Sequence, residues 1–173
     1  MPQIAYTFSK NDEWYTPAYA VYPIIRFLKP NSVIWCPFDT AESEFVKVLK
    51  KHNFKVIFTH IISGGDFFTA EVPDCDYIIS NPPYSKKTEV LFRLFEIGKP
   101  FAMLINLQGI FDSRDRFKLF KENQFEMLWL SPRVNFIKQS GASPSGVPFQ
   151  SGYICSRILD HQLEFEYLDR SLT

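Results

Sequence analysis

The chain has 173 residues, 46% of them hydrophobic and 22% charged, with 19 basic and 19 acidic side chains. This composition is typical of a soluble globular protein, and the length predicts a single domain, residues 1–173, with its own core. A net charge of zero excludes a global electrostatic attraction to nucleic acid, so any such contact has to come from local patches.

Cys36, Cys75 and Cys155 are far apart in the sequence and have no zinc-ligand spacing. Their odd number and scatter fit a reducing cytoplasm, where we expect the protein. We expect no metal site. The sequence has no signal peptide and no apolar run near 18 residues, so we expect neither secretion nor membrane insertion.

The first patterned segment is Trp14-Tyr15-Thr16-Pro17 and the apolar residues that follow it. Thr16 is typical of a helix N-cap and Pro17 of a first helical residue, and the apolar spacing predicts a helix over residues 19–28 whose first turns Pro23 should disturb. These residues either contact a ligand or begin a helix that packs in the core.

Residues 33–36 predict a short buried strand, and a helix is expected over residues 43–52. The turn between them contains Pro37, Phe38 and Asp39. In an α/β nucleotide-binding fold, this first strand, turn and helix usually bind the cofactor. Because the turn has no glycine that would let the backbone approach a pyrophosphate, it argues against a pyrophosphate site and leaves contact with an uncharged or zwitterionic cofactor open.

Residues 55–62 predict a second strand, which carries His60 near its end in place of an acidic residue that would bind ribose hydroxyls. His60 is either a ligand contact or a polar residue at a strand end. The next turn contains Asp66, Phe67 and Phe68. A carboxylate beside two aromatic rings suits an adenine ring, and a surface turn with two buried phenylalanines is the alternative.

A buried strand predicted over residues 76–80 ends in Asn81-Pro82-Pro83-Tyr84. Two prolines stop a strand in a stiff turn, and in open α/β sheets ligands bind at such strand ends. The Asn81 side-chain carbonyl and the Pro82 backbone carbonyl can both accept from one planar amino group, which relieves the charge that grows on nitrogen during attack. Tyr84 can stack on a flat base. An ordinary proline turn is the alternative.

The remaining sequence alternates predicted helices and strands. Helices are expected over residues 90–97 and 112–122, and strands over residues 101–105, 125–130, 149–158 and 163–168, the last at a sheet edge. This alternation predicts an α/β fold with a mostly parallel central sheet and helices on both faces. Residues 139–148 form a small-residue loop that we expect to be mobile.

With its strands placed, the chain resembles the S-adenosylmethionine-dependent, adenine-specific methyltransferases, in particular the EcoRI-type and phage-encoded members. Asn81-Pro82-Pro83-Tyr84 matches the catalytic Asn/Asp-Pro-Pro-Tyr/Phe motif of the family, and the cofactor elements precede it, as in the γ arrangement. The resemblance implies a Rossmann-like methyltransferase fold. It also implies S-adenosyl-L-methionine as cofactor, with the candidate contacts Trp14, Tyr15, Thr16, Pro17, Pro37, Phe38, Asp39, His60, Asp66, Phe67 and Phe68.

The resemblance further implies methyl transfer to the N6 of a flipped-out adenine in DNA, by a chain that we expect to be a monomer. Asn81, Pro82, Pro83 and Tyr84 would form the catalytic turn. The chain leaves no room for a separate target-recognition domain, so base readout would come from loops such as residues 139–148 and should be short or lax. The candidate phosphate contacts are Lys86, Lys87, Arg133 and Lys138.

The sequence leaves three other functions open. The substrate adenine can belong to RNA. The turn also suits the glutamine side-chain amide of a protein, because that nitrogen is equally planar. The missing glycines of the first turn leave open a non-catalytic nucleic-acid- or cofactor-binding relative.

Overall fold

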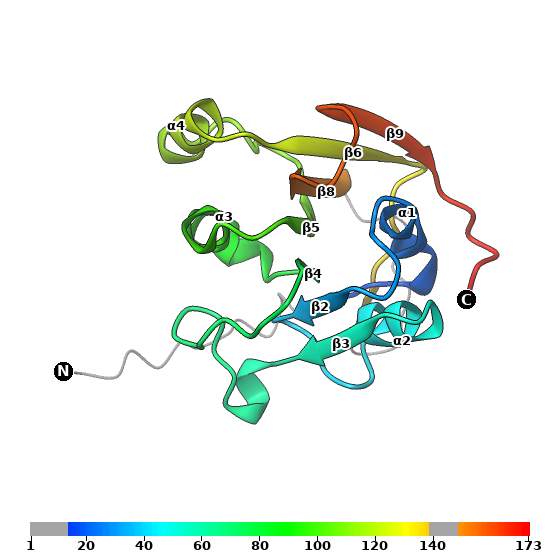
Figure 1. The fold of residues 1–173 in the computed structure, drawn as a ribbon. Coiled ribbons are helices and arrows are strands. Elements are labelled where there is room, and N and C mark those ends of the chain that lie inside the picture. Colours follow the sequence, from blue (N-terminus) through cyan, green and yellow to red (C-terminus); the bar gives the residue numbers. More distant parts are fainter. Residues whose placement is uncertain (1–13, 139–148) are drawn as a thin grey trace.

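The computed structural model describes residues 14–138 and 149–173, so the loop predicted to be mobile, residues 139–148, lies outside the described residues. A seven-stranded sheet runs through the centre of the molecule in the order β3-β2-β4-β5-β8-β6-β9. Figure 1 shows α1 and α2 on one side of this sheet and α3 and α4 on the other. This arrangement agrees with the predicted α/β class.

The strands lie close to their predicted positions. Four neighbouring strands run parallel to one another: β3 (Lys55–Phe58), β2 (Val33–Cys36), β4 (Tyr77–Ser80) and β5 (Phe101–Asn106). Three more complete the sheet: β8 (Ser151–Ser156), β6 (Glu126–Ser131) and β9 (Leu163–Tyr167). β8 is antiparallel to both β5 and β6, and β9 is parallel to β6, so the sheet is mostly parallel.

The described helices are mostly short. The α-helices are α1 (Tyr22–Ile25), α2 (Glu44–Lys51), α3 (Lys87–Ile97) and α4 (Arg114–Glu122), and the 3-10 helices are η1 (Ala18–Ala20), η2 (Ile61–Ser63) and η3 (Tyr84–Lys86). The helix predicted over residues 19–28 is interrupted where a disturbance by Pro23 was predicted: η1 and α1 are separate elements, because Pro23 has no N–H with which to continue a helix. α1 then ends at Ile25, so the predicted extension to residue 28 is wrong. The strand predicted over residues 55–62 ends at Phe58, and η2 takes up its last residues.

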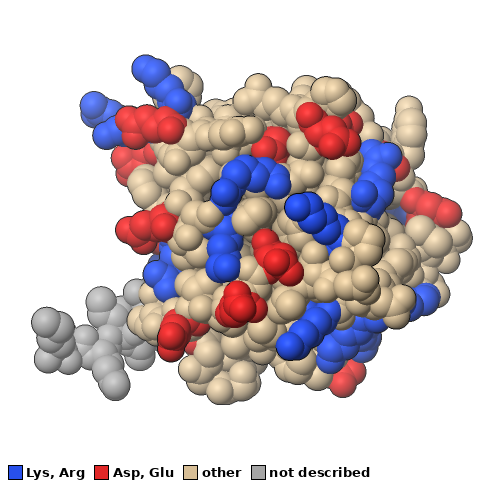
Figure 2. Space-filling model, viewed as in Figure 1, with Lys and Arg blue, Asp and Glu red and all other residues tan. Residues whose placement is uncertain are grey.

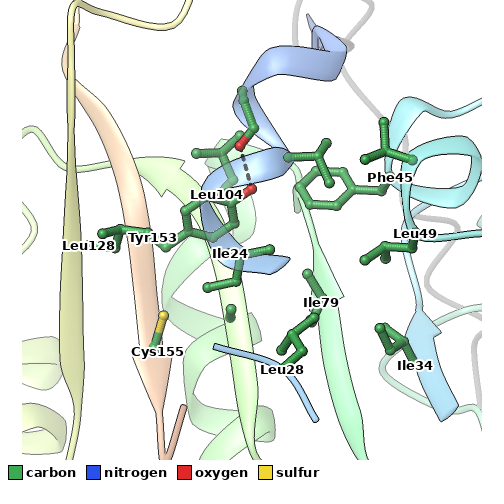
Figure 3. Close-up of a cluster of buried hydrophobic side chains, with 14 of the residues drawn as sticks. Ile24, Leu28, Ile34, Phe45, Leu49, Ile79, Leu104, Leu128, Tyr153 and Cys155 are labelled. Carbon is green, nitrogen blue, oxygen red and sulfur yellow. Dashed lines mark hydrogen bonds between the residues drawn. The ribbon is translucent and has the colours of Figure 1, made fainter. Parts of the chain in front are cut away.

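One face of the sheet packs against α1 and α2. Its buried cluster includes Ile34, Ile79 and Tyr153 from three strands, together with Ile24 of α1 and Phe45 of α2 (Figure 3). Each fully buried side chain of this size stabilises the fold by about 1.5–3 kcal/mol. The Tyr153 hydroxyl donates to the backbone carbonyl of Ala20 at 2.7 Å, so this buried polar group is satisfied.

The opposite face packs against α3 and α4. Its cluster includes Trp35, Ile78 and Met103 from three strands, with Leu91 of α3 and Phe120 of α4. Neighbouring residues on one strand thus belong to different clusters, as the alternation of side chains along a strand requires. Both faces are covered, which explains why β4 is buried over its whole length.

The order of the strands creates a topological switch point in the sheet. β3 pairs with one side of β2 and β4 with the other, so the chain reverses its direction across the sheet between β2 and β4. Ligands of open α/β sheets bind beside the carboxyl ends of the strands at such a switch point. β2 ends at Cys36 and β4 at Ser80, so the two predicted functional turns, residues 37–40 and 81–84, begin at this position.

A two-stranded ribbon completes the described structure. β1 (Trp14–Tyr15) pairs antiparallel with β7 (Ile137–Lys138), and Tyr15 lies opposite Ile137. The ribbon brings the first described residues beside the segment that follows β6. It therefore joins two parts of the chain that carry predicted functional residues.

Candidate functional site

The turn that follows β4 is held at both of its ends. β4 is buried before Asn81, and Tyr84 is already the first residue of η3, which leads directly into α3. Pro82 is buried, and Pro83 has an extended backbone with φ −60° and ψ 127°. Because proline fixes φ, this conformation needs little further ordering.

The side chain of Asn81 is tied to the first described segment. Its Nδ2 donates to Oγ1 of Thr16 at 3.0 Å, and Thr16 is only 8% exposed. The N-cap role predicted for Thr16 is wrong, because Pro17 occupies the N-cap of η1 and no side chain caps that helix. The threonine hydroxyl serves the turn after β4 instead.

A second polar contact joins the two strands of the switch point. The hydroxyl of Ser80 donates to Oδ2 of Asp39, and both residues are buried. Burial raises the pKa of Asp39 to about 6, and hydrogen bonds from Ser80 and Ser43 act in the opposite direction. The backbone N–H of Asp39 also donates to the carbonyl of Thr59 at 3.2 Å. Asp39 therefore connects the turn after β2 both to β4 and to the end of β3.

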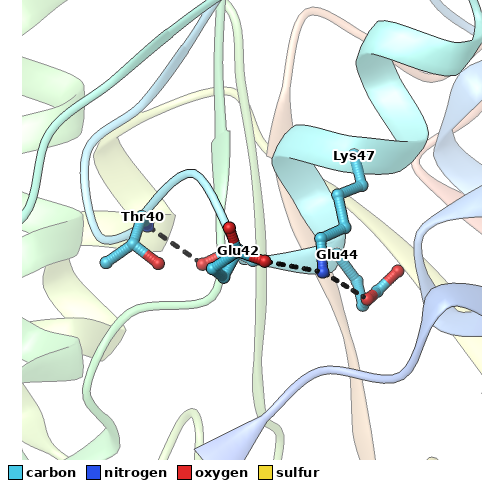
Figure 4. Close-up of polar contacts among 5 residues, drawn as sticks. Thr40, Glu42, Glu44 and Lys47 are labelled. Carbon is cyan, nitrogen blue, oxygen red and sulfur yellow. Dashed lines mark hydrogen bonds and ion pairs between the residues drawn. The ribbon is translucent and has the colours of Figure 1, made fainter.

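A network of exposed side chains shapes the start of α2, immediately after Asp39. The N–H of Thr40 donates to Oγ of Ser43 at 3.0 Å. Lys47 forms ion pairs with Glu42 at 3.3 Å and Glu44 at 3.5 Å (Figure 4). These carboxylates raise the pKa of Lys47. Exposed ion pairs of this kind contribute little to stability.

The turn after β2 lies against the turn at residues 65–68. The ring of Phe38 lies 4.9 Å from the ring of Phe67, and Pro37 is buried beside it. A Cβ atom at Gly65 would lie 2.8 Å from Cβ of Thr59, so this close approach to the end of β3 requires glycine. The predicted cofactor contacts of the turn after β2 and of the turn at residues 65–68 thus lie side by side, beyond the carboxyl ends of β2 and β3.

The two phenylalanines of the 65–68 turn have different environments. Phe67 is 2% exposed, and its ring contacts both Trp35 and Phe38, so it belongs to the core. Phe68 is half-buried, and its N–H donates to Oδ1 of Asp66 at 3.0 Å. Among the described residues Oδ2 of Asp66 accepts no hydrogen bond, which leaves an acceptor beside a partly exposed ring.

Two residues near these turns were not predicted from the sequence. Arg93 of α3 donates from Nε to the carbonyl of Phe67 at 2.8 Å and from Nη2 to the carbonyl of Ala70 at 3.0 Å. Ser80, described above, is the other. A polar residue at the end of a buried strand was a signal for Ser80, whereas no sequence pattern distinguishes Arg93 from other surface positions of an amphipathic helix.

His60 is the N-cap of η2. Its Nδ1 accepts a hydrogen bond from the N–H of Ile62 at 3.2 Å, so the side chain is held at the start of this helix.

Tyr84 packs between two aromatic rings. The ring of Tyr84 meets Phe149 at 5.4 Å and Phe136 at 6.0 Å, both edge-to-face. Burial raises the pKa of Tyr84, which keeps its hydroxyl neutral.

The four predicted phosphate contacts lie in different settings. Lys86 forms an ion pair with Glu89 at 3.5 Å. Lys87 donates to the carbonyl of Gln108 at 3.0 Å, and burial, followed by the Arg116 charge, lowers its pKa. Arg133 is exposed, and Lys138 is the last residue of β7. On the face drawn in Figure 2, basic and acidic side chains are interspersed.

The turn at residues 65–68, which lies against the turn after β2, fits the adenosine part of a nucleoside cofactor. An adenine ring needs a flat apolar neighbour and an acceptor for its amino group, and Phe68 and Asp66 present both. The turn after β2 fits less directly, because the carboxylate of Asp39 is already used by Ser80.

Metal ligands do not gather in the part of the chain that the structure describes, where no group of three His, Cys, Asp or Glu side chains has a suitable arrangement. Its three cysteines are buried free thiols, and burial raises the pKa of each.

None of the described helices has the length and apolar character needed to cross a membrane.

No protein-family model matches the sequence, and no curated protein sequence matches it. Thirteen solved chains match the structure. One is the methyltransferase subunit of a type I restriction-modification system from Streptococcus thermophilus, with 13% identity and a TM-score of 0.54, covering 90% of this chain and 47% of that one. Another is a dimethyladenosine transferase from Plasmodium falciparum, with 13% identity and a TM-score of 0.48, covering 82% of this chain and 62% of that one.

The chain thus spans about half the length of the restriction-modification subunit that it matches. At 13% identity the likeness shows the fold alone. The chain has an α/β fold similar to that of the restriction-modification methyltransferase subunit, and the order of its strands places the Asn81 turn where ligands of open α/β sheets bind.

Proposed function

We propose that this protein transfers a methyl group from S-adenosyl-L-methionine to the exocyclic N6 of adenine in DNA. The observation that carries the proposal is the Asn81–Tyr84 turn at the carboxyl end of β4, beside the switch point and tied through Asn81 to Thr16. Residues 1–173 would act as one methyltransferase domain. The methyltransferase fold supports the reaction type, and the fold's match in a restriction-modification system favours DNA as substrate.

S-adenosyl-L-methionine supplies an electrophilic methyl group when bound. Asp66 would accept from the amino group of its adenine, and Phe68 would pack against the ring, with Phe67 beneath it in the core. The other residues proposed to contact the cofactor are Trp14, Tyr15, Pro17, Pro37, Phe38, Asp39 and His60. Thr16 was also predicted to contact the cofactor, but its hydroxyl accepts from Asn81.

Asn81 and Pro82 would hold the target amine. A planar amine is a poor nucleophile because its lone pair is delocalised into the ring. Two carbonyl acceptors favour a tetrahedral nitrogen and relieve its growing positive charge. The prolines hold both acceptors in place before the substrate arrives, so alignment costs little at the moment of reaction.

Tyr84 would form one wall for the flipped base. Its ring is fixed edge-to-face by Phe136 and Phe149, and its neutral hydroxyl would not repel a nucleic acid.

The proposed phosphate contacts are Lys86, Lys87, Arg133 and Lys138. Because the net charge is zero, we expect DNA binding to depend on these few local charges and to weaken with added salt.

The test offers labelled S-adenosyl-L-methionine with DNA, RNA and a protein extract in parallel. We expect the wild type to form N6-methyladenine in DNA, detected by mass spectrometry after digestion. Asn81→Ala should lower the rate by about 10²–10³-fold, as expected when a preorganised hydrogen-bonding group is removed.

Asn123→Ala is the matched control. Asn123 is also half-buried, and its side chain also donates a hydrogen bond, to the carbonyl of Leu119 at 2.8 Å, but it follows α4, away from the switch point. This variant should keep the wild-type rate. Label that enters only RNA or only protein would contradict the substrate, and a fully active Asn81→Ala variant would contradict the role of the turn.

A further inference from the structure

The hydrogen bond between Asn81 and Thr16 has a direction. Nδ2 of Asn81 is the donor and Oγ1 of Thr16 the acceptor, at 3.0 Å, between residues 65 positions apart. An asparagine amide has a donor end and an acceptor end of nearly equal shape. In this structure the donor end faces Thr16, and the threonine hydroxyl oxygen accepts. With Nδ2 directed toward Thr16, Oδ1 has to face away from Thr16.

Thr16 is itself held firmly enough to act as a reference point. It follows β1, which pairs with β7, and it precedes Pro17, which is buried and caps η1. Thr16 is 8% exposed, so its side chain is shielded from water. Phe136, the residue before β7, packs edge-to-face on Tyr84 at 6.0 Å. Each strand of the ribbon therefore leads directly to a residue that contacts the turn after β4.

The orientation of the Asn81 amide matters for the function proposed above, on which this inference rests. The substrate amine is a hydrogen-bond donor, so the turn has to present Oδ1 to it. If the amide turned by half a rotation, the NH₂ group of Asn81 would face the substrate NH₂ group, and two donors would meet. We propose that Thr16 is a positioning residue, which holds the Asn81 amide with its carbonyl oxygen directed toward the substrate amine.

Two substitutions separate this role from a cofactor contact. Thr16→Val keeps the shape of the side chain but cannot accept from Nδ2, whereas Thr16→Ser keeps the hydroxyl. We expect Thr16→Val to lower kcat by about 100-fold, in line with the cost of a misaligned catalytic group. The Kd for S-adenosyl-L-methionine, measured by calorimetry, should stay within about twofold, and Thr16→Ser should restore kcat to within about threefold of the wild type.

A Thr16→Val variant with the kcat of the wild type at saturating cofactor would overturn the inference. If the Kd for the cofactor also rises at least tenfold in that variant, Thr16 acts as a cofactor contact instead.

A readout that needs no activity completes the test. The side-chain NH₂ signals of Asn81, assigned by their loss in Asn81→Ala, should shift in the NMR spectrum of Thr16→Val and return in Thr16→Ser. Unchanged signals in Thr16→Val would overturn the inference. If the signals shift as expected but the wild type methylates no substrate, the proposed function fails while the orienting contact stands.

Discussion

Side-chain hydrogen bonds of Asn81 and Ser80 tie the turn after β4 to distant segments. The turn at residues 65–68 also accepts a hydrogen bond from a distant residue, Arg93, but unlike the turn after β4 it is anchored by a phenylalanine in the hydrophobic core. Thr16 bonds to Asn81, and Asp39 accepts from Ser80, the residue before it. Phe67, in contrast, is 2% exposed and contacts the rings of Trp35 and Phe38.

The difference predicts different consequences when each turn is altered. Apolar packing is non-directional and stabilises in proportion to the buried area, whereas a hydrogen bond contributes modest stability but defines an orientation. Changes in the 65–68 turn should therefore affect stability and cofactor affinity. Changes in the polar contacts of the turn after β4 should affect alignment and pH dependence.

The largest expected effect on stability comes from Phe67→Ala. Removing this ring leaves a cavity between Trp35 and Phe38 and should lower the free energy of unfolding by about 3–5 kcal/mol. Denaturant unfolding measures the change. Phe165→Ala is the control, because Phe165 is 69% exposed on β9 and its loss should cost less than about 0.5 kcal/mol. If the two substitutions lowered the free energy of unfolding by the same amount, Phe67 would not anchor the 65–68 turn in the core.

Asp39 should make the stability of the protein depend on pH. Its pKa is about 6 in the folded chain and 3.8 in an ordinary carboxyl group. Between these values the folded state keeps a proton that the unfolded state has lost. The free energy of unfolding therefore falls as pH rises from about 4 to 6, by about 3 kcal/mol in total.

The groups around Asp39 do not titrate in that range. Cys36 and Tyr153 lie near it, and burial raises the pKa of both, so they stay neutral. Denaturant unfolding of Asp39→Asn at pH 4, 5, 6 and 7 should lack the fall that the wild type shows. Asp74→Asn, at an exposed carboxylate, should keep it. The same fall in Asp39→Asn and in the wild type would show that another group causes it.

The smallest expected effect is that of Asp66→Asn on cofactor affinity. Asparagine can keep the bond from the N–H of Phe68 to Oδ1, but it replaces the second acceptor oxygen with an NH₂ donor. We expect the Kd for S-adenosyl-L-methionine to rise about tenfold, with kcat at saturating cofactor unchanged. Calorimetry checks the affinity, and Asp74→Asn should bind as the wild type does. A fall in kcat without a change in Kd would place Asp66 in the alignment of the amine instead.

The sequence by itself determined the α/β class, the approximate strand positions and the place of the Asn81-Pro82-Pro83-Tyr84 turn. These features depend on local periodicity and on the backbone limits of proline, which act between near neighbours in the chain. The same local rules failed at Thr16, where an N-cap pattern was present but the hydroxyl has another partner.

Only the tertiary structure decided which side chains meet. Whether Asp39 lies beside Ser80, or Arg93 beside the carbonyl of Phe67, depends on strand order and helix placement rather than on any pattern near those residues. The same holds for the contact of Thr16 with Asn81, which spans 65 residues. Loop closure brings such groups together only when the whole sheet forms, because burial of the two apolar clusters has to offset the entropy of ordering the chain between them.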